Sequence, residues 1–457
     1  MTTLAQSLQR VALDTPDTLA LLNSSGSWSY GDLLALARRG AGRLLAARPR
    51  GARIAAVSGT ASELALASYQ CAAAGLGFMP LDAATAERRW PTLRDEGGDG
   101  LWRTALPASG GVADEWSSVA DCRCDDIALV IATSGSEGMP KAVMLSRGNL
   151  AAAAEASNER IPLNRGDVWL ACLPLHHIGG ISILHRCARA GATVLLHEGF
   201  DAVAVWRDVV SGGVTHISLV PAMLARLLDV ADRPPPSRLR YALIGGAALS
   251  RPLFDRAVAA GWPLCPSYGL SECAAQVATL VRPAAGQWVE GAVGALMPGG
   301  DARIGDDGRL RLRGPQVMLG YLNPQLRPGL GLDEGEFVTS DLARFAANGS
   351  LTIIGRADDV LVTGGVNVHP LEVESCLAGC PGVADVAITA IPDPVWGDLL
   401  VALVVGPAEP ETVQDFARQR LASPMRPRRV VPALRLPRNP MGKLDRAALP
   451  ALAKECA

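Results

Sequence analysis

A glycine- and hydroxyl-rich run that ends in a lysine follows an apolar stretch of the chain. The run is Thr133-Ser134-Gly135-Ser136-Glu137-Gly138-Met139-Pro140-Lys141. Glycines let a backbone approach an anion, hydroxyls donate hydrogen bonds to phosphate oxygens, and the lysine adds a mobile positive charge. The spacing is not that of a Walker loop, because a second apolar stretch follows instead of a helix. The pattern indicates a phosphate-binding loop or, as the simpler alternative, a Ser/Gly-rich turn.

A second run of residues that could do chemistry also follows an apolar stretch. It is Ser267-Tyr268-Gly269-Leu270-Ser271-Glu272. A carboxylate is a ligand that Mg²⁺ accepts, and a tyrosine ring can lie along a flat base. A solvated glutamate at the start of a helix is the simpler alternative. The adjacent His176 and His177 lack a spaced third ligand, which argues against a metal site there.

Two later segments and one lysine complete the set of candidates. Asp341, in Thr339-Ser340-Asp341, could bind vicinal hydroxyls, and Arg356 supplies a cation close to Asp358. Lys443 lies in Asn439-Pro440-Met441-Gly442-Lys443, near the end of the chain. The 43 Lys and Arg residues include only three lysines. A guanidinium cannot replace a compact ammonium on a flexible stem, so Lys141 and Lys443 are singled out before any motif is compared.

The elements that must position these residues alternate between short apolar runs and helical patterns. This alternation predicts an α/β fold with layered, mostly parallel sheets covered by helices. Ligands bind at the carboxyl ends of such strands, where the candidate residues fall. The predicted strands are 53–59, 127–135, 167–175, 192–199, 216–221 and 241–249.

The pattern changes after about residue 285. Asp-Gly and Asn-Gly turns predict hairpins at 303–314 and 345–355, and therefore a small β-rich subdomain. Beyond residue 355 a short α+β unit follows, with a helix predicted from Leu371 to Leu377. We therefore expect two domains, an N-terminal one over 1–355 and a small mobile C-terminal one over 356–457.

Composition excludes several classes of partner. The formal charge is -2 with no long basic tract, which argues against nucleic acid. No run of about twenty uncharged apolar residues is present, so neither a membrane nor export is expected and the predicted location is cytoplasmic. The ten cysteines are scattered, which is typical of reduced, mostly buried thiols.

Together and in this order, the motifs resemble those of the adenylate-forming superfamily, which includes acyl and aryl CoA ligases, luciferases and peptide-synthetase adenylation domains. The resemblance extends from WSYGDLLALARRGAGRLLA, near residue 28, to the Lys443 loop. It implies ATP, Mg²⁺ and coenzyme A as cofactors and an acid that is converted through an acyl adenylate to a thioester. The C-terminal domain would insert Lys443 for adenylation and then swing about a hinge at Asp358.

The resemblance also assigns roles to individual residues. Lys443, His177 and Glu272 would be catalytic, with Glu272 holding the metal. The other ATP and AMP contacts would be Thr133, Ser134, Gly135, Ser136, Gly138, Lys141, Gly245, Gly246, Ala247, Tyr268, Gly269, Ser271, Asp341 and Arg356. The acyl pocket would be lined by His177, Ser218, Gly246, Gln276, Val277 and Ala278.

The chain departs from the family pattern at three places. Glu137 stands where a hydroxyl is usual, so it either points away from the phosphates or helps to hold the metal. Ser340 stands where glycine is usual. LASPMRPRR replaces an aromatic-lysine stretch near residue 421, although Arg426, Arg428 and Arg429 could bind the CoA phosphate.

The segments VTHISLVPAML (214–224) and SYGLSECAAQVATL (267–280) are most similar to o-succinylbenzoate CoA ligases of menaquinone biosynthesis. A few pocket residues suffice to change the acid, so another aryl or medium-chain acid remains open. Two further alternatives are an adenylation enzyme that loads a carrier protein and a catalytically silent binding protein. Trp396-Gly397-Asp398 resembles the CoA ligase branch. The sequence leaves a homodimer open.

Overall fold

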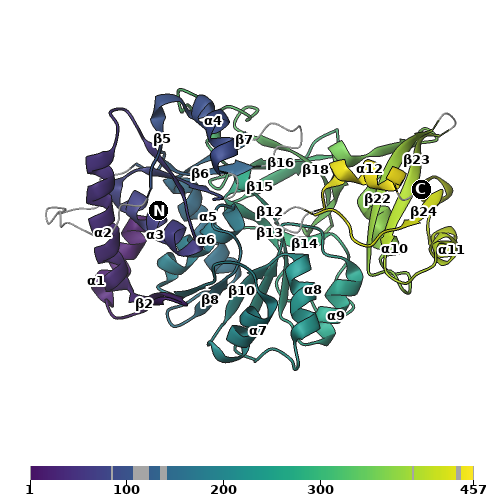
Figure 1. Ribbon diagram of the computed structural model, residues 1–457, viewed down its shortest axis with the longest axis horizontal. Helices are drawn as coiled ribbons and strands as arrows, with labels where there is room; N and C mark the ends of the chain where they lie inside the picture. The colour runs from purple at the N-terminus through teal and green to yellow at the C-terminus, as the bar shows by residue number, and fades with distance from the viewer. Residues whose placement is uncertain are drawn as a thin grey trace.

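The computed structural model describes residues 2–83, 86–105, 123–133, 141–393, 396–438 and 444–455. Figure 1 shows a large body that contains the N-terminus and a smaller one, drawn in light green and yellow, formed by the C-terminal residues. Two sheets with surrounding helices build the large body, and the smaller body has a sheet of its own. The predicted α/β fold, with a large N-terminal and a small C-terminal part, is confirmed.

The centre of the larger sheet is parallel and its two ends are antiparallel. Adjacent strands in the order β12-β11-β10-β8-β9-β1 run parallel, and β2 pairs antiparallel with β1 at one edge. This centre corresponds to four of the predicted apolar runs. The strands are β1 (Leu19–Asn23), β2 (Gly26–Ser29), β8 (Val168–Ala171), β9 (Thr193–Leu196), β10 (His216–Leu219), β11 (Tyr241–Ile244) and β12 (Leu264–Leu270).

Beyond β12 every further pair in this sheet is antiparallel. Both predicted hairpins are present here, because the Asp307-Gly308 and Asn348-Gly349 turns each connect two neighbouring strands. This half corresponds to the predicted small β-rich subdomain, and it continues the parallel sheet through β12 and β13. The strands are β13 (Ala275–Thr279), β14 (Ala292–Leu296), β15 (Asp301–Ile304), β16 (Arg309–Arg313), β18 (Phe337–Phe345) and β19 (Leu351–Arg356).

The second sheet has the order β17-β7-β6-β4-β3-β5. Strand β7 returns antiparallel to β6, so the predicted phosphate loop joins the two strands of a hairpin and does not lead into a helix. The loop itself, residues 134–140, lies outside the described residues. The strands are β3 (Ile54–Ser58), β4 (Gly77–Leu81), β5 (Leu101–Arg103), β6 (Ile127–Thr133), β7 (Lys141–Ser146) and β17 (Gly320–Tyr321).

Capping explains where several helices of the large body begin. At α1, α2, α3 and α5 a Ser or Thr side chain accepts from a backbone amide three residues on, and that residue's side chain accepts in return. Helix α5 contacts strands of both sheets, and α7, α8 and α9 cover one face of the larger sheet (Figure 1). The helices are α1 (Leu4–Asp14), α2 (Tyr30–Ala47), α3 (Ala61–Ala74), α4 (Ala86–Gly97), α5 (Arg147–Arg160), α6 (Ile178–Ala190), α7 (Ala202–Ser211), α8 (Pro221–Val230) and α9 (Arg251–Ala259).

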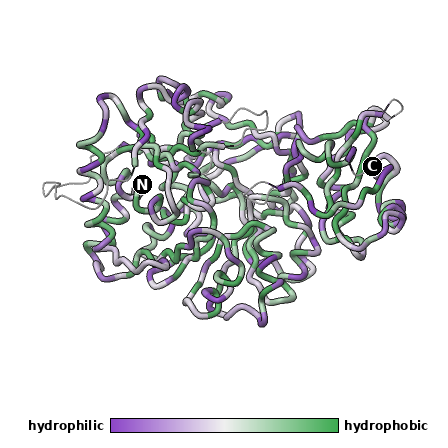
Figure 2. Tube along the Cα trace, in the orientation of Figure 1, coloured by the Kyte–Doolittle hydropathy of each residue, from purple (hydrophilic) through white to green (hydrophobic). Residues whose placement is uncertain are grey.

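The C-terminal part has hydrophobic clusters that draw only on residues from Leu361 onward. Figure 2 shows mainly hydrophobic colour along its strands and hydrophilic colour on α11 at its outer edge. The domain boundary predicted at 355 and 356 stays a proposal; β19 of the larger sheet ends at Arg356, and this separate core begins at Leu361. The elements are β20 (Leu361–Thr363), β21 (Val366–Val368), β22 (Asp385–Asp393), β23 (Gly397–Val405), β24 (Arg429–Pro432), α10 (Pro370–Leu377), α11 (Pro410–Arg420) and α12 (Leu449–Glu455).

Contacts between the two parts are made by α10, which packs against β19. The Glu290 carboxylate also accepts a hydrogen bond from Ser375, while burial raises the Glu290 pKa. Within the described residues, every helix is too short or too polar to cross a membrane. The eight described cysteines carry free thiols, six of them buried, as the sequence predicts for reduced cysteines.

Candidate active site

Asp341 is held by three groups at the junction of β18 and β19. The Tyr268 hydroxyl donates to Asp341 Oδ2 at 2.5 Å, and the Arg356 guanidinium lies 3.9 Å from Oδ1. Thr339 Oγ1 accepts from the Asp341 amide at 3.0 Å. Burial, and then the negative charge of Asp341, raise the Tyr268 pKa well above its usual value, so the phenol stays protonated and keeps donating. A carboxylate has about four acceptor positions, so capacity for ribose hydroxyls remains.

Glu272 lies four residues beyond Tyr268, in a short 3₁₀ turn. The Tyr321 hydroxyl donates to Glu272 Oε1 at 3.0 Å, and the Lys141 ammonium lies over the Tyr321 ring, 5.5 Å from its centroid. The amide of Met318 donates to the Glu272 carbonyl at 2.7 Å. Residues from three separate segments thus meet around Tyr321 and Glu272.

Tyr321 is the member of this cluster that sequence reasoning missed. It lies on β17, a two-residue strand that pairs with β7 beside Val143. Neither the length of this strand nor its spacing from other candidates marks the residue in the sequence. A tyrosine directly after a Leu-Gly pair was the only local signal, and the contact with Glu272 spans 49 positions.

The backbone around Glu272 is strained. Ala274 and Ala275 have φ values of 51° and 103°, a region that residues other than glycine rarely occupy. A Cβ on Gly269 would lie 1.6 Å from the Ala275 carbonyl oxygen, so glycine is required there. This tight turn directs the Tyr268–Glu272 segment toward the carboxyl edge of the sheet. The steric requirement explains why position 269, a predicted ATP contact, is a glycine.

The Gly245-Gly246-Ala247 turn leaves the carboxyl end of β11. A Cβ on Gly245 would lie 3.2 Å from the Ser267 carbonyl oxygen, and Gly246 has a φ of +79°. The turn therefore lies against the start of the tyrosine segment, next to β12. The structure brings these two predicted nucleotide-binding segments together.

Thr133 and Lys141 face each other at the base of the predicted phosphate loop. They are paired in the β6–β7 hairpin, and Thr133 Oγ1 donates to the Lys141 carbonyl at 2.9 Å. Arg89 also donates to the Thr133 carbonyl, at 3.1 Å. The remaining loop residues of the prediction, Ser134, Gly135, Ser136 and Gly138, together with Glu137, lie outside the described residues.

The predicted acyl pocket residues come from four places in the fold, one of which is the Gly246 turn after β11. His177 is the residue before α6, and its ring lies 4.4 Å from that of His176, centroid to centroid. Burial lowers the pKa of His176. Ser218, on β10, accepts a hydrogen bond from the Trp169 indole at 3.1 Å, so its hydroxyl is already engaged with the core.

The other predicted pocket residues, Gln276, Val277 and Ala278, are buried on β13. Gln276 Nε2 donates to Thr279 at 2.8 Å, whereas Gln276 Oε1 has no hydrogen-bond partner in the described part of the chain. A buried acceptor without a hydrogen bond destabilises the fold, so this oxygen is a candidate contact for a bound molecule.

The predicted hinge residue Asp358 is bound on both sides. The Arg356 guanidinium donates to Asp358 Oδ2 at 3.1 Å. A hydrogen bond from the Ser340 side chain is the main cause that lowers the Asp358 pKa. Ser340, which replaces the usual glycine, is therefore in contact with the hinge.

Lys443 lies outside the described residues, but the chain just after it is anchored. Arg446 donates to both carboxylate oxygens of Glu374 at 2.9 Å and lies 3.1 Å from Asp359. Glu374, 7% exposed, also accepts from the Ile388 amide at 2.8 Å. Arg446 thus ties the lysine loop both to α10 and to the hinge segment.

The Glu272 carboxylate fits a magnesium ion that is bound together with a nucleotide. Among the described residues, no group of three His, Cys, Asp or Glu side chains could hold a metal ion. Mg²⁺ commonly uses one or two carboxylates with waters and substrate phosphates, so Glu272 alone suffices as a protein ligand. Its Oε1 accepts from Tyr321, and its second oxygen provides a further acceptor.

Residues 95–322 match the family model described as AMP-binding enzyme, and residues 372–443 match its C-terminal domain. A 2-succinylbenzoate–CoA ligase of Bacillus licheniformis is 32% identical over 96% of this chain and 98% of that protein. The o-succinylbenzoate CoA synthetase of Bacillus subtilis with its acyl-adenylate intermediate has a TM-score of 0.86 at 28% identity, covering 98% of each chain. ATP-bound MatB from Rhodopseudomonas palustris gives 0.88 at 26% identity, covering 99% of each chain. The chain belongs to the AMP-binding enzyme family.

Proposed function

We propose that this protein is an ATP-dependent acid:CoA ligase that forms an acyl adenylate and then transfers the acyl group to coenzyme A. The observation that carries the proposal is the junction of two clusters on one short segment. Tyr268 donates to Asp341, and four residues later Glu272 accepts from Tyr321 beneath Lys141. A ribose-binding carboxylate, a metal-binding carboxylate and a phosphate-binding ammonium are what a nucleoside triphosphate requires.

The reaction must bring two anions together, because a carboxylate oxygen attacks the α-phosphorus of ATP. The bond from that phosphorus to the bridging oxygen breaks, and pyrophosphate leaves with that oxygen. Charge neutralisation and alignment are therefore the main tasks of the site. Asp341 and Arg356 would hold the ribose, Lys141 would bind the outer phosphates, and Lys443 would approach from the C-terminal part. Mg²⁺ held by Glu272 would supply further positive charge to the phosphates.

Thioester formation needs a different arrangement. The thiol attacks the acyl carbon, the bond to the adenylate oxygen breaks, and AMP leaves with that oxygen. Lys443 is then no longer needed beside the phosphate. The Asp358 hinge and the separate C-terminal core are consistent with a rotation that removes it.

We propose 2-succinylbenzoate as the acid. The relative of Bacillus licheniformis that carries this activity in its name aligns over nearly the whole of both chains. The predicted pocket wall, Gln276, Val277 and Ala278, offers small or neutral side chains, which suit a flat aryl group.

A pyrophosphate-release assay tests both parts of the proposal. The assay would be run on a panel of acids that includes 2-succinylbenzoate, benzoate, hexanoate and malonate, each with CoA, without CoA, or with a carrier protein. We expect the highest kcat/KM with 2-succinylbenzoate and CoA. Preference for another acid would overturn the substrate assignment, and turnover with carrier protein but not CoA would overturn the acceptor.

A further inference from the structure

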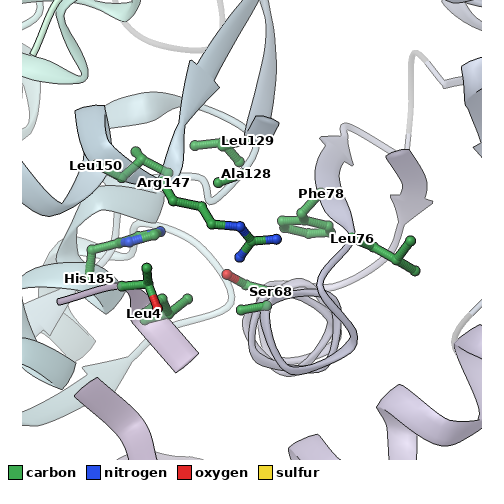
Figure 3. A pocket seen from close by; sticks show the side chains of 11 residues that line it. Leu4, Ser68, Leu76, Phe78, Ala128, Leu129, Arg147, Leu150 and His185 are labelled. Atoms are coloured by element: carbon green, nitrogen blue, oxygen red, sulfur yellow. The ribbon is translucent and has the colours of Figure 1, made fainter. Parts of the chain in front are cut away.

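A small cavity lies outside the nucleotide site, between α1, α3, α5 and α6 and next to strands β4 and β6. Its volume is about 20 Å³, while one water needs roughly 10–15 Å³ on the same scale. The cavity therefore has room for one or two species the size of a water molecule. Figure 3 shows the Arg147 side chain extending into it from the start of α5.

Within the described residues, the Arg147 guanidinium is buried without a counter-charge. The residue is 4% exposed, and its Nε and Nη2 have no hydrogen-bond partner in the described part of the chain. The described residues that line the cavity include no Asp or Glu. None of the salt bridges in the described part of the chain involves Arg147. Asp126, which accepts from the Arg147 amide through its carbonyl, uses its carboxylate to accept from the Arg123 amide.

The remaining polar groups of the cavity can donate but add no negative charge. The Ser68 hydroxyl points toward the guanidinium in Figure 3, and His185 lies on the other side of the Arg147 stem. Burial lowers the pKa of His185 to about 4, so its imidazole is neutral at pH 7 and can donate one N–H. Among the described residues that line the cavity, Arg147 therefore carries the positive charge, and the others are uncharged at pH 7.

We propose that this cavity binds one small monovalent anion, of the size of chloride, as the counter-ion of Arg147. A buried charge is strongly unfavourable unless it is paired, and a water molecule can accept from the guanidinium but cannot neutralise it. The volume admits a halide but not a tetrahedral oxyanion such as phosphate or sulfate. The ion would join the start of α5 to α3, beneath the hairpin that carries the phosphate loop.

Thermal unfolding at constant ionic strength tests the proposal. Sodium gluconate would be replaced stepwise by sodium chloride or bromide, because gluconate is too large for the cavity. A ligand that binds only the folded state raises Tm, and we expect a rise of about 2 °C for a bound halide. In Arg147→Met, which keeps the length of the side chain but removes its charge, this rise should disappear.

Arg186→Met serves as the matched control. Arg186 is also buried, at 3% exposure, but its guanidinium lies over the Trp169 ring and not in the cavity. Its variant should keep the halide response. Crystals of the unmodified protein grown in bromide should show an anomalous peak beside the Arg147 guanidinium, which gives a result even where a variant fails to fold. An equal Tm in gluconate and halide, or bromide crystals without that peak, would overturn the proposal and leave water as the occupant.

Discussion

The two parts of the molecule that carry the proposed active-site residues are built differently. In the large part, Tyr268 donates to Asp341 and Tyr321 donates to Glu272, and the continuous antiparallel half of the larger sheet supports Tyr268 and Asp341. In the C-terminal part, the described residues on both sides of the Lys443 loop are anchored, because Arg438 donates to Asp385 and pairs with Leu444, and Arg446 binds Glu374 and Asp359. The proposed nucleotide-binding groups are therefore preformed in the large part, whereas the proposed catalytic ammonium, Lys443, belongs to the C-terminal part and would be delivered by it.

Removing the delivered ammonium should have the largest effect. We expect Lys443→Ala to slow adenylate formation about 10²–10³-fold, since the loss of one group that stabilises transition-state charge costs that much. Thioester formation from a supplied acyl adenylate should change only a few-fold. Stopped-flow assays of the two half-reactions measure this, with Lys454→Ala, an exposed lysine, as the control. Equal losses in both half-reactions would contradict the delivery role.

The anchor of the loop is the next target. Arg446→Met would leave the buried Glu374 carboxylate without its bidentate partner, and breaking such a pair costs about 3–5 kcal/mol. Because Arg446 is 27% exposed, the lower end of this range is expected. Hydrogen exchange should report the loss of protection in α10 and β22.

Arg418→Met provides the control for that experiment. Its partner Asp415 is exposed, and pairs of this kind contribute at most about 1 kcal/mol. A loss of protection in Arg446→Met no larger than that of the control would show that the Arg446–Glu374 pair does not stabilise α10 and β22.

On the preformed side, Tyr268→Phe should weaken nucleotide binding about tenfold. The substitution removes a hydrogen bond to a charged group, which typically contributes about 1.5–3 kcal/mol, while the ring and its packing remain. Calorimetric titration with AMP measures the effect. Tyr241→Phe is the control, because Tyr241 contacts the His216 ring and lies at the opposite end of its strand from the Gly245 turn. An unchanged AMP affinity in Tyr268→Phe would show that the hydrogen bond from Tyr268 to Asp341 does not contribute to ribose binding.

The smallest effect is expected at the hinge. Ser340→Gly restores the residue usual in related sequences and removes the hydrogen bond to Asp358, a contribution of about 0.5–1.5 kcal/mol. We expect the thioester half-reaction to become a few-fold faster, with the rate of adenylation nearly unchanged. An unaltered thioester rate would mean that this bond does not restrain the rotation.

Local patterns in the sequence predicted several of the strands and two hairpins, and they placed candidate residues at strand ends. Apolar runs with β-branched residues placed the strands, and the Asp-Gly and Asn-Gly turns placed two hairpins, because these signals act over a few residues. The expected position of the candidates at strand ends follows from the same periodicity. Thr133, Gly245 and Tyr268 do lie at the carboxyl ends of β6, β11 and β12.

What the tertiary structure decided are contacts between residues far apart in the chain. Tyr321 reaches Glu272, Ser340 reaches the Asp358 hinge, and Arg147 enters a cavity beside Ser68. Their side chains are ordinary in composition and spacing, so the sequence carries no periodic signal for them. Only the packing of sheets and helices brings such groups within hydrogen-bonding or Coulombic range, where their partners determine what they do.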